Sequence, residues 1–351
     1  MASVINIANR KIGPGSPPFI IAEMSGNHNQ SLARAFQIVD AAVSAGAHAV
    51  KLQTATPDGL TLNVDSPDFV ISDPESVWNG ENLYDLYKEA VTPWEWHEPI
   101  FDYCAQKGII AFSSPFELKA VDFLENLNVP CYKIASFELV DVQLVRRVAQ
   151  TGKPLIISTG MASLGEIELA VNTARAEGNN QIVLLKCTST YPASPADSNL
   201  LTIPHLQKAF GTQVGLSDHT MGVGVPCAAV TLGATAVEKH FTLSRAEGGV
   251  DSAFSMEPHE LRLLVEETER AWQALGSIRY GVTEKEQGSL KFRRSIYICE
   301  DIDAGAVLTH KNLRVIRPGF GLPPKFLEIL IGRRVNKSLK KGTAMTWDHI
   351  G

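Results

Sequence analysis

Eight short apolar runs, each bounded by turn residues, alternate with stretches of helical spacing as far as residue 275. Such alternation is typical of β/α units on a parallel sheet. Eight units with no GxGxxG after the first strand favour a closed (β/α)₈ TIM barrel over an open doubly wound sheet. The runs are FIIAEMS (19–25), AVKLQT (49–54), IIAFSS (109–114), CYKIAS (131–136), PLIIST (154–159), IVLLKCTS (182–189), QVGLSDH (213–219) and TAVEKHF (235–241).

The segments between the runs predict helices and one long loop. Residues 31–46 place apolar side chains on one helical face and end at Gly46, and residues 260–275 form a second amphipathic segment. The connection from Thr54 to Ile109 has room for an extra loop rich in Asp, Pro and Ser. A loop after the second strand lies on the catalytic face of a barrel, so we expect 57–82 to form a substrate-side flap.

After Leu275 the pattern changes to short β-like pieces punctuated by glycine, with no long helix. The sequence therefore predicts three parts: a barrel domain at 1–276, a linker at 277–289 and a small β-rich domain at 290–351.

Composition narrows the range of partners. A formal net charge of −6 with 20% charged residues offers no basic face for nucleic acid. The longest apolar stretch, 225–237, is broken by Gly, Thr and Pro and is too short to span a membrane. The first 13 residues lack a basic region followed by an apolar core, so we expect no secretory signal there, and five scattered cysteines form no CxxC pair. We expect a cytoplasmic protein with free thiols that binds neither nucleic acid nor membrane.

Two histidines end the last two predicted strands. His219 shares the parity of Ser217, and His240 shares the parity of Glu238. Neighbouring strands lie about 4.8 Å apart, so the two imidazoles could share one ion, with water and an oxygen-rich substrate completing the coordination. An octahedral divalent ion such as Mn²⁺ suits these ligands, with Mg²⁺ and Co²⁺ as alternatives. The other interpretation is that each is a hydrogen-bonded structural histidine.

Lysines and hydroxyls gather at the other strand ends. Ammonium groups offset negative charge and hydroxyls donate to phosphate oxygens, so the set predicts a cradle for a phosphorylated substrate. Turn chemistry and solvated lysine head groups are the alternatives. The residues are Lys51, Gln53, Lys133, Ser136, Ser158, Thr159, Thr188 and Ser189.

Three carboxylates, Glu23, Glu138 and Asp251, follow the strands or lie in the loop after the eighth. Each could act as a base on water or orient a sugar hydroxyl, or could be a helix cap or a solvated charge. Lys186 and Lys239 stay ambiguous; a buried Lys186 could instead form a Schiff base.

Nine strings occur in an order that resembles the sialic acid synthase family: IAEMSGNHN, KLQT, SSPF, YKIAS, ISTGM, KCTSTYP, GLSDHT, VEKHFT and RPGFG. The resemblance implies a phosphoenolpyruvate-condensing enzyme that makes nine-carbon acids from an acetamido sugar, with a C-terminal antifreeze-like (SAF) domain. AEMSGNHNQ, KCTSTYP and GGVDSAFS are similar to the pseudaminic acid branch, whose sugar is 2,4-diacetamido-2,4,6-trideoxy-L-altrose.

The resemblance also assigns roles. It implies that His219 and His240 bind the metal, and that Glu23, Lys51 and Lys133 act in catalysis. Arg317, in RPGFG, matches an arginine inserted into the partner's barrel, which implies a homodimer with swapped SAF domains. The implied phosphoenolpyruvate contacts are Lys51, Ser114, Lys133, Ser136, Ser158, Ser189 and Ser217, and the sugar-side groups are Glu23, Gln53, Glu138, Tyr191 and Asp251.

Four other hypotheses stay open. The sugar could be of the mannose type, as in N-acetylneuraminate or legionaminate synthesis. A Schiff-base aldolase would use Lys186 and need no metal. A metallohydrolase barrel would commonly carry HxH on its first strand, where this chain has Glu23. A non-catalytic glycan-binding protein would rest on the tail alone.

Overall fold

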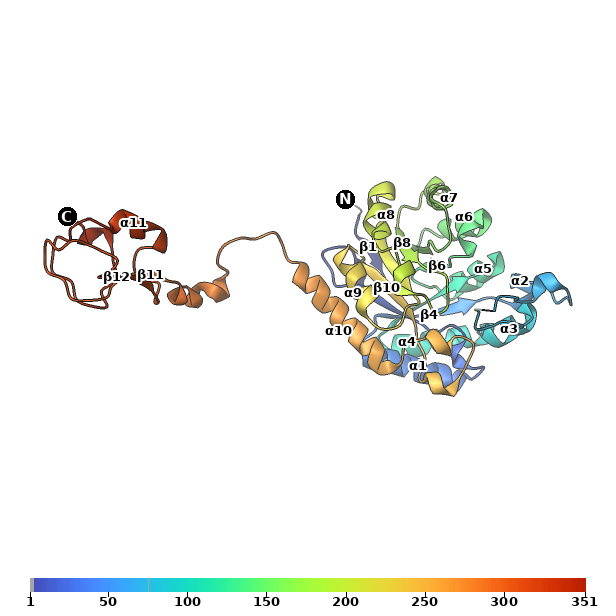
Figure 1. The fold of residues 1–351 in the computed structure, drawn as a ribbon. Helices are drawn as coiled ribbons and strands as arrows, with labels where there is room; N and C mark the ends of the chain where they lie inside the picture. The colour runs from blue at the N-terminus through green and yellow to red at the C-terminus, as the bar shows by residue number, and fades with distance from the viewer. Residues whose placement is uncertain (1–2, 75) are drawn as a thin grey trace. The chain divides into compact units, whose positions relative to one another are not determined.

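The computed structural model describes residues 3–74 and 76–351. It divides into two compact units, Met1–Gly276 and Ser277–Gly351, and each is described by itself (Figure 1).

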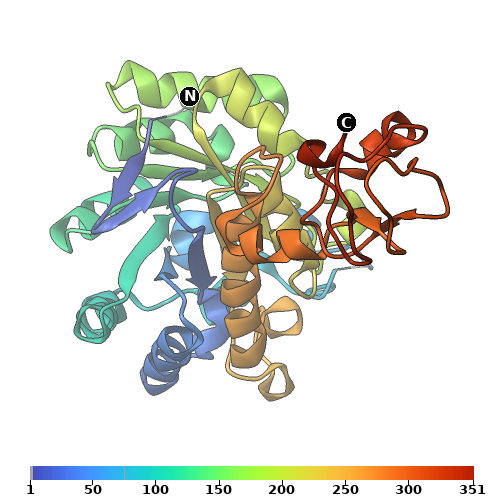
Figure 2. The same ribbon diagram turned by 90° about the vertical axis from the view of Figure 1, so that its left-hand side faces the viewer.

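The first unit is built on a closed barrel of parallel strands surrounded by helices (Figure 1, Figure 2). The strands follow the order β10-β3-β4-β5-β6-β7-β8-β9, and each overlaps one predicted run, so the predicted (β/α)₈ fold is confirmed. The strands are β3 (Phe19–Glu23), β4 (Ala49–Thr54), β5 (Ile110–Pro115), β6 (Tyr132–Ile134), β7 (Leu155–Ser158), β8 (Ile182–Cys187), β9 (Gln213–Asp218) and β10 (Ala236–His240).

Capping residues fix both ends of the first surrounding helix, α1 (Leu32–Ala45). Ser31 accepts a hydrogen bond from the Arg34 N–H at the start of α1, and Gly46, with φ of 85°, ends it. The helices are α1 (Leu32–Ala45), α4 (His97–Lys107), α5 (Leu118–Asn126), α6 (Val142–Ala149), α7 (Leu164–Ala176), α8 (Thr202–Phe210), α9 (Gly224–Thr231) and α10 (Pro258–Leu275). The short helix α2 (Pro57–Leu60) forms the start of the predicted flap, and α3 (Leu83–Ala90) directly follows the flap.

Side chains alternate between the barrel interior and the helices. Ile20, Val50 and Val237 pack outward with residues of α1, α4 and α10. Phe19, Ile21 and their inward counterparts on the other strands fill the lower interior. Gly215 faces inward on β9, where a Cβ atom would lie 2.6 Å from the Leu185 side chain, so only glycine fits this layer. Apart from Gln213 at the start of β9, this layer is apolar, and the other inward-facing polar groups gather in the C-terminal part of the barrel.

An N-terminal hairpin, which the sequence analysis did not predict, covers the other end of the barrel. Its strands are β1 (Ile5–Ile7) and β2 (Arg10–Ile12), paired antiparallel. Ile5, Ile7 and Ile12 belong to the same buried cluster as Phe19 and the other lower interior residues. The hairpin therefore closes the N-terminal end of the barrel with apolar side chains.

The second unit has its own small core. Its strands β11 (Ser295–Ile298) and β12 (Leu313–Ile316) pair antiparallel, and a short helix, α11 (Leu327–Leu330), follows. A 3₁₀ helix at Glu284–Phe292 begins inside the segment expected to be the linker. The core comprises Ile296, Ile298, Leu308, Leu313, Leu330, Val335, Leu339 and Met345. Within the described ranges of both units, no helix is both long and apolar enough to cross a membrane.

Candidate active site

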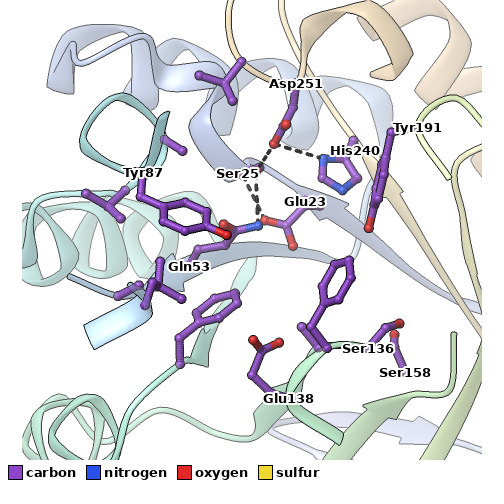
Figure 3. Close-up of a pocket in the computed structure, with 18 of the residues that line it drawn as sticks. Glu23, Ser25, Gln53, Tyr87, Ser136, Glu138, Ser158, Tyr191, His240 and Asp251 are labelled. Carbon is purple, nitrogen blue, oxygen red and sulfur yellow. Dashed lines mark hydrogen bonds and ion pairs between the residues drawn. The ribbon is translucent and has the colours of Figure 1, made fainter. Parts of the chain in front are cut away.

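A cavity of about 310 Å³ opens at the C-terminal ends of the barrel strands (Figure 3). Its floor is formed by inward-facing residues two or four positions after the apolar layer along each strand, which is where a (β/α)₈ barrel places its chemistry. The strand residues that line it are Glu23, Lys51, Gln53, Lys133, Ser158, Cys187, Ser217, Glu238 and His240.

The structure brings most of the predicted site residues to this cavity. Ser114 lies beside it, where its hydroxyl accepts a hydrogen bond from Lys51 Nζ at 3.0 Å. Ser189 lies near the rim, with its hydroxyl 3.8 Å from Cys187 Sγ. Arg317 directly follows β12 in the second unit. The predicted residues that line the cavity are Glu23, Lys51, Gln53, Lys133, Ser136, Glu138, Ser158, Tyr191, Ser217, His219, His240 and Asp251.

Two buried lysines share one carboxylate at the floor. Lys133 Nζ lies 3.2 Å from Glu238 Oε1, and Lys51 Nζ lies 3.8 Å from Glu238 Oε2. Lys51 is also paired with Glu23, its neighbour in the β3–β4 register. All four side chains are at most 6% exposed, so the ammonium groups are held almost without water.

Burial and charge move the pKa values of this cluster in different directions. Burial raises the pKa of Glu23 to about 7, although the Lys51 ammonium opposes the rise. Burial also acts to raise the pKa of Glu238, but Lys133 and Lys51 outweigh it and hold that pKa below its usual value. Desolvation lowers the pKa of Lys133. Glu238 thus stays ionised, while Glu23 can gain or lose a proton near neutral pH.

Glu138 is a second carboxylate with a raised pKa. It lies across the cavity from His240 (Figure 3), and burial raises its pKa to about 7. Its Oε2 atom is buried and makes no hydrogen bond within the described part of the chain. A ligand hydroxyl or amide N–H would satisfy this oxygen.

The two strand-end histidines lie side by side, with ring centroids 5.3 Å apart. His219 Nδ1 lies 2.8 Å from the Thr188 carbonyl oxygen and donates to it, and the His219 side chain is also hydrogen-bonded to that of Cys187. Burial acts to lower the pKa of His219, but the contacts with Cys187 and Thr188 outweigh it and raise that pKa. His240 Nδ1 is buried and makes no hydrogen bond to any described residue. Burial, and then the charge of His219, lower the pKa of His240 well below its usual value. The low pKa keeps His240 neutral, as a metal-binding imidazole must be.

The donor set fits a divalent ion only in part. Asp251 Oδ2 lies 3.6 Å from His240 Nδ1 and occupies the same side of the cavity (Figure 3). Among residues 3–74 and 76–351, no group of three His, Cys, Asp or Glu side chains is arranged to hold a metal. The two imidazoles could therefore supply two ligands, and oxygens of substrate or water would have to supply the others.

Aromatic rings fix the imidazoles in place. The Tyr191 ring lies 4.3 Å from that of His219, and Phe254 lies 5.0 Å from His240. Trp78, from the predicted flap, lies 5.6 Å from Tyr191 and donates from Nε1 to the Val250 carbonyl at 2.9 Å. The flap thus reaches the loop after β10 across one side of the cavity.

Several cavity residues were missed by the sequence analysis. Glu238 and Cys187 carried a usable signal, because each has the inward parity of its strand. Ser25 follows β3 without any distinctive pattern. The flap and α3 contribute an apolar wall whose residues have no motif: Leu60, Ile71, Trp78, Leu83, Leu86 and Tyr87.

The two ambiguous lysines lie outside the lining of the cavity. Lys186 Nζ donates to the Cys187 carbonyl at 2.9 Å and to Thr188 Oγ1 at 2.7 Å. Lys239 Nζ pairs with Asp218 Oδ2 at 2.9 Å. The Schiff-base hypothesis gains no support, because the nitrogen of Lys186 is turned toward its own backbone.

Comparison with known proteins covers both units. A model of the NeuB family matches residues 38–280, and a model of the SAF domain matches residues 293–351. The chain is 42% identical to the pseudaminic acid synthase of Helicobacter pylori over 95% of this chain and 98% of that protein. It is 36% identical to the N,N'-diacetyllegionaminic acid synthase of Legionella pneumophila over 98% of this chain and 99% of that protein.

A solved structure agrees with these matches. The N-acetylneuraminic acid (sialic acid) synthetase of Leptospira borgpetersenii, crystallised with citrate, superposes with a TM-score of 0.73 at 32% identity. The match covers 84% of this chain and 97% of that chain.

Proposed function

Because this chain belongs to the NeuB family, as its motifs predicted, we propose that it condenses phosphoenolpyruvate with 2,4-diacetamido-2,4,6-trideoxy-L-altrose, giving pseudaminic acid and phosphate. The enzyme class is that of the phosphoenolpyruvate-condensing synthases of sialic acid type. The choice of sugar is supported by identities of 42–43% to pseudaminic acid synthases, against 36% and 32% to legionaminic acid synthases.

The observation that carries the proposal is the pair of buried lysines at the cavity floor. Lys51 and Lys133 share the carboxylate of Glu238, and both line the cavity. Because they are buried, water screens their charges little from a ligand in the cavity. Ser158 Oγ is buried beside Ser136 (Figure 3) and makes no hydrogen bond within the described chain. Two ammonium groups and a free hydroxyl suit the carboxylate and phosphate oxygens of phosphoenolpyruvate.

The opposite wall suits a deoxy sugar. Leu60, Ile71, Leu83 and Leu86 present apolar side chains from the flap and α3. A 6-deoxy sugar with two acetamido groups carries three methyl groups, and burying them is favourable. A sugar with a 6-hydroxyl would leave that group facing apolar carbon.

The proposed reaction forms one bond between C3 of phosphoenolpyruvate and C1 of the open-chain sugar. Water then adds at C2, and phosphate leaves with cleavage of the C–O bond. Lys51 and Lys133 would offset the charge of the departing phosphate. Glu23, with a pKa of about 7, can give a proton to the aldehyde oxygen or accept one from the water.

His219 and His240 are the residues that would hold a divalent ion, for which we propose Mn²⁺ with Mg²⁺ or Co²⁺ as alternatives. When bound, such an ion polarises a carbonyl oxygen as a Lewis acid. The support is the 5.3 Å separation of the two ring centroids and the Nδ1 of His240, which makes no hydrogen bond within the described chain.

We also propose that the protein acts as a homodimer in which Arg317 of one subunit enters the barrel of the other. The test is co-expression of a His219→Ala chain with an Arg317→Ala chain. Neither variant alone is expected to be active, whereas in a swapped heterodimer one cavity has both residues intact. About a quarter of the sites would then be restored if the subunits assort at random. Activity no greater than that of the separate variants would contradict the exchange.

The cysteines are consistent with reaction in the cytoplasm, which we propose as its location. Cys104, Cys131 and Cys187 are buried, Cys227 and Cys299 are partly buried, and all five are free. Unpaired thiols are usual in a reducing compartment.

The decisive experiment measures phosphate release from phosphoenolpyruvate against a panel of sugars. We expect kcat/KM for the L-altrose sugar to exceed that for N-acetylmannosamine and for the legionaminic acid precursor by about 10-fold or more, because a misplaced methyl or hydroxyl group costs about 1–3 kcal/mol. Mass spectrometry of the nine-carbon acid identifies the product. Higher kcat/KM with a mannose-type sugar would overturn the proposed substrate.

A further inference from the structure

We propose that Ser25 is a positioning residue for the sugar, orienting Gln53 and Asp251 as a pair of hydrogen-bond acceptors for the substrate's amide N–H groups. The inference rests on the proposed function, since it concerns the sugar side of the same cavity.

Ser25 has an unusual backbone conformation. It begins the 3₁₀ helix η1 (Ser25–His28) after β3, with φ of 46° and a side chain that is almost fully buried. The left-handed region disfavours residues with a Cβ atom, and glycine would adopt it more easily. Such strain persists at functional sites when the surrounding contacts require the side chain.

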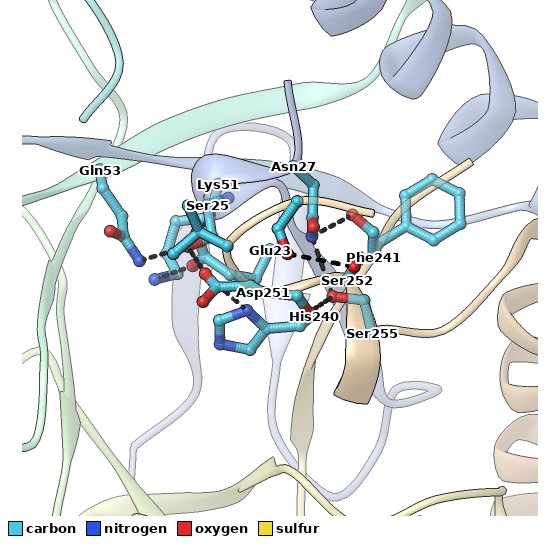
Figure 4. Close-up of polar contacts among 12 residues, drawn as sticks. Glu23, Ser25, Asn27, Lys51, Gln53, His240, Phe241, Asp251, Ser252 and Ser255 are labelled. Atoms are coloured by element: carbon cyan, nitrogen blue, oxygen red, sulfur yellow. Dashed lines mark hydrogen bonds and ion pairs between the residues drawn. The ribbon is translucent and has the colours of Figure 1, made fainter. Parts of the chain in front are cut away.

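The hydroxyl of Ser25 links two elements of the cavity (Figure 4). Gln53 Nε2, on β4, donates to Ser25 Oγ at 3.0 Å, and Ser25 Oγ donates its single hydrogen to Asp251 Oδ2. The backbone N–H of Ser25 donates to Glu23 Oε1 at 2.9 Å. The direction of this chain is therefore fixed, from amide to hydroxyl to carboxylate.

The loop that carries Asp251 is held from the same side. Ser255 Oγ donates to the Asp251 carbonyl oxygen at 2.7 Å, and Asn27 Nδ2 donates to Ser255 Oγ at 2.9 Å. These bonds fix the backbone of Asp251, and its carboxylate is oriented by Ser25 Oγ together with a hydrogen bond from the backbone of Gly26.

These hydrogen bonds determine which atoms of Gln53 and Asp251 are available to the sugar. Because the amide nitrogen of Gln53 faces Ser25, its Oε1 atom is the group left for a ligand. Asp251 also lines the cavity and accepts hydrogen bonds when ionised. Two acceptors in one wall suit a substrate that offers N–H donors, which is the chemistry of an acetamido sugar and not of phosphoenolpyruvate.

The test compares Ser25→Ala with Ser25→Gly. Both remove the hydroxyl, but only glycine relieves the strained backbone. We expect each to raise KM for the sugar about 10-fold or more, since a buried carboxylate loses a hydrogen bond. KM for phosphoenolpyruvate should change by less than about 2-fold, because the proposed binding site of that substrate does not include the hydrogen bonds that link Gln53, Ser25 and Asp251. A Ser25→Gly enzyme with wild-type KM for the sugar would show that only the backbone matters and would overturn the inference.

A neighbouring serine provides the matched control. Ser252 is buried beside Asp251, but its hydroxyl donates to the Gly249 carbonyl oxygen at 3.1 Å. It takes no part in the hydrogen bonds that link Gln53, Ser25 and the Asp251 carboxylate. Ser252→Ala should leave KM for the sugar within about 2-fold. Combining Ser25→Ala with Gln53→Ala should cost less than the sum of the two single changes, because both remove the same link. Full additivity would contradict the proposal.

Sugar analogues test the substrate class separately from the proposed reaction. The loss on Ser25→Ala should shrink for an analogue that lacks one acetamido group, and an equal loss for every analogue would overturn the role for N–H donors. If the wild type prefers another acetamido sugar, the proposed substrate fails. The ratio of the Ser25→Ala and wild-type Kd values for that sugar, measured by calorimetry, still decides the role of Ser25.

Discussion

Replacing His219 with alanine is expected to lower kcat/KM by about 10²–10⁴-fold, the equivalent of several kcal/mol of charge stabilisation by a bound ion. The two imidazole rings have centroids 5.3 Å apart at the cavity, and Nδ1 of His240 makes no hydrogen bond within the described chain. Metal content of the purified variant, measured by mass spectrometry of the elements, should fall together with the activity.

The exposed His205 on α8 provides the control for this change. His205→Ala should retain both metal and activity, because its imidazole lies on the surface of the barrel. Chelation of wild-type enzyme followed by return of Mn²⁺ should remove and then restore turnover. Full turnover of the wild type in excess chelator would contradict the proposed metal site.

Glu238→Gln is expected to lower the free energy of unfolding by about 3–5 kcal/mol, which is the usual cost of leaving a buried charge without its partner. Glu238 is the carboxylate that Lys51 and Lys133 share, and Ser217 Oγ also donates to it at 3.2 Å. Glutamine keeps the size of the side chain but removes the carboxylate that the two buried ammonium groups share, and leaves Glu23, Glu138 and Cys187 as the other groups that act on their charge. Urea unfolding of the full chain, followed by circular dichroism, measures the loss.

The loss in Glu238→Gln should be greater at pH 7 than at pH 9. Burial lowers the pKa of Lys133, and without Glu238 it should fall further. A lysine with a lower pKa in the folded state binds fewer protons folded than unfolded, so stability rises as the pH rises toward the unfolded pKa.

An exposed ion pair provides the comparison for Glu238. Asp122 pairs with Arg147 on the barrel surface at 2.6 Å, and Asp122→Asn should cost no more than about 1 kcal/mol. Equal losses in the two variants would show that the buried cluster does not stabilise the barrel in the way described.

The sequence contained enough to predict the barrel and most of its cavity. Strand parity placed His219 and His240 on the inner face, and the same rule brought Lys51 and Gln53 into one cavity. These predictions succeeded because a closed parallel barrel fixes side-chain direction by position in the strand, with few alternatives.

The remaining features depend on contacts between segments far apart in the chain. Ser25 is ordinary in sequence and gains its environment only from Gln53 and Asp251. The apolar wall has no periodicity, because a flap and a short helix supply it together. The N-terminal hairpin is too short for a strand signal, and its apolar residues pack into the barrel only once the barrel exists.

The N-terminal hairpin of β1 and β2 affects the order in which substrates can bind. Because Ile5, Ile7 and Ile12 close one end of the barrel, the described residues leave the C-terminal end as the route by which substrates reach the cavity. Lys51 lies deeper along β4 than Gln53. Phosphoenolpyruvate bound at the lysines would therefore have to enter the cavity before a sugar bound above it. The kinetic mechanism would then be ordered: phosphoenolpyruvate binds first, and the bound sugar blocks its dissociation.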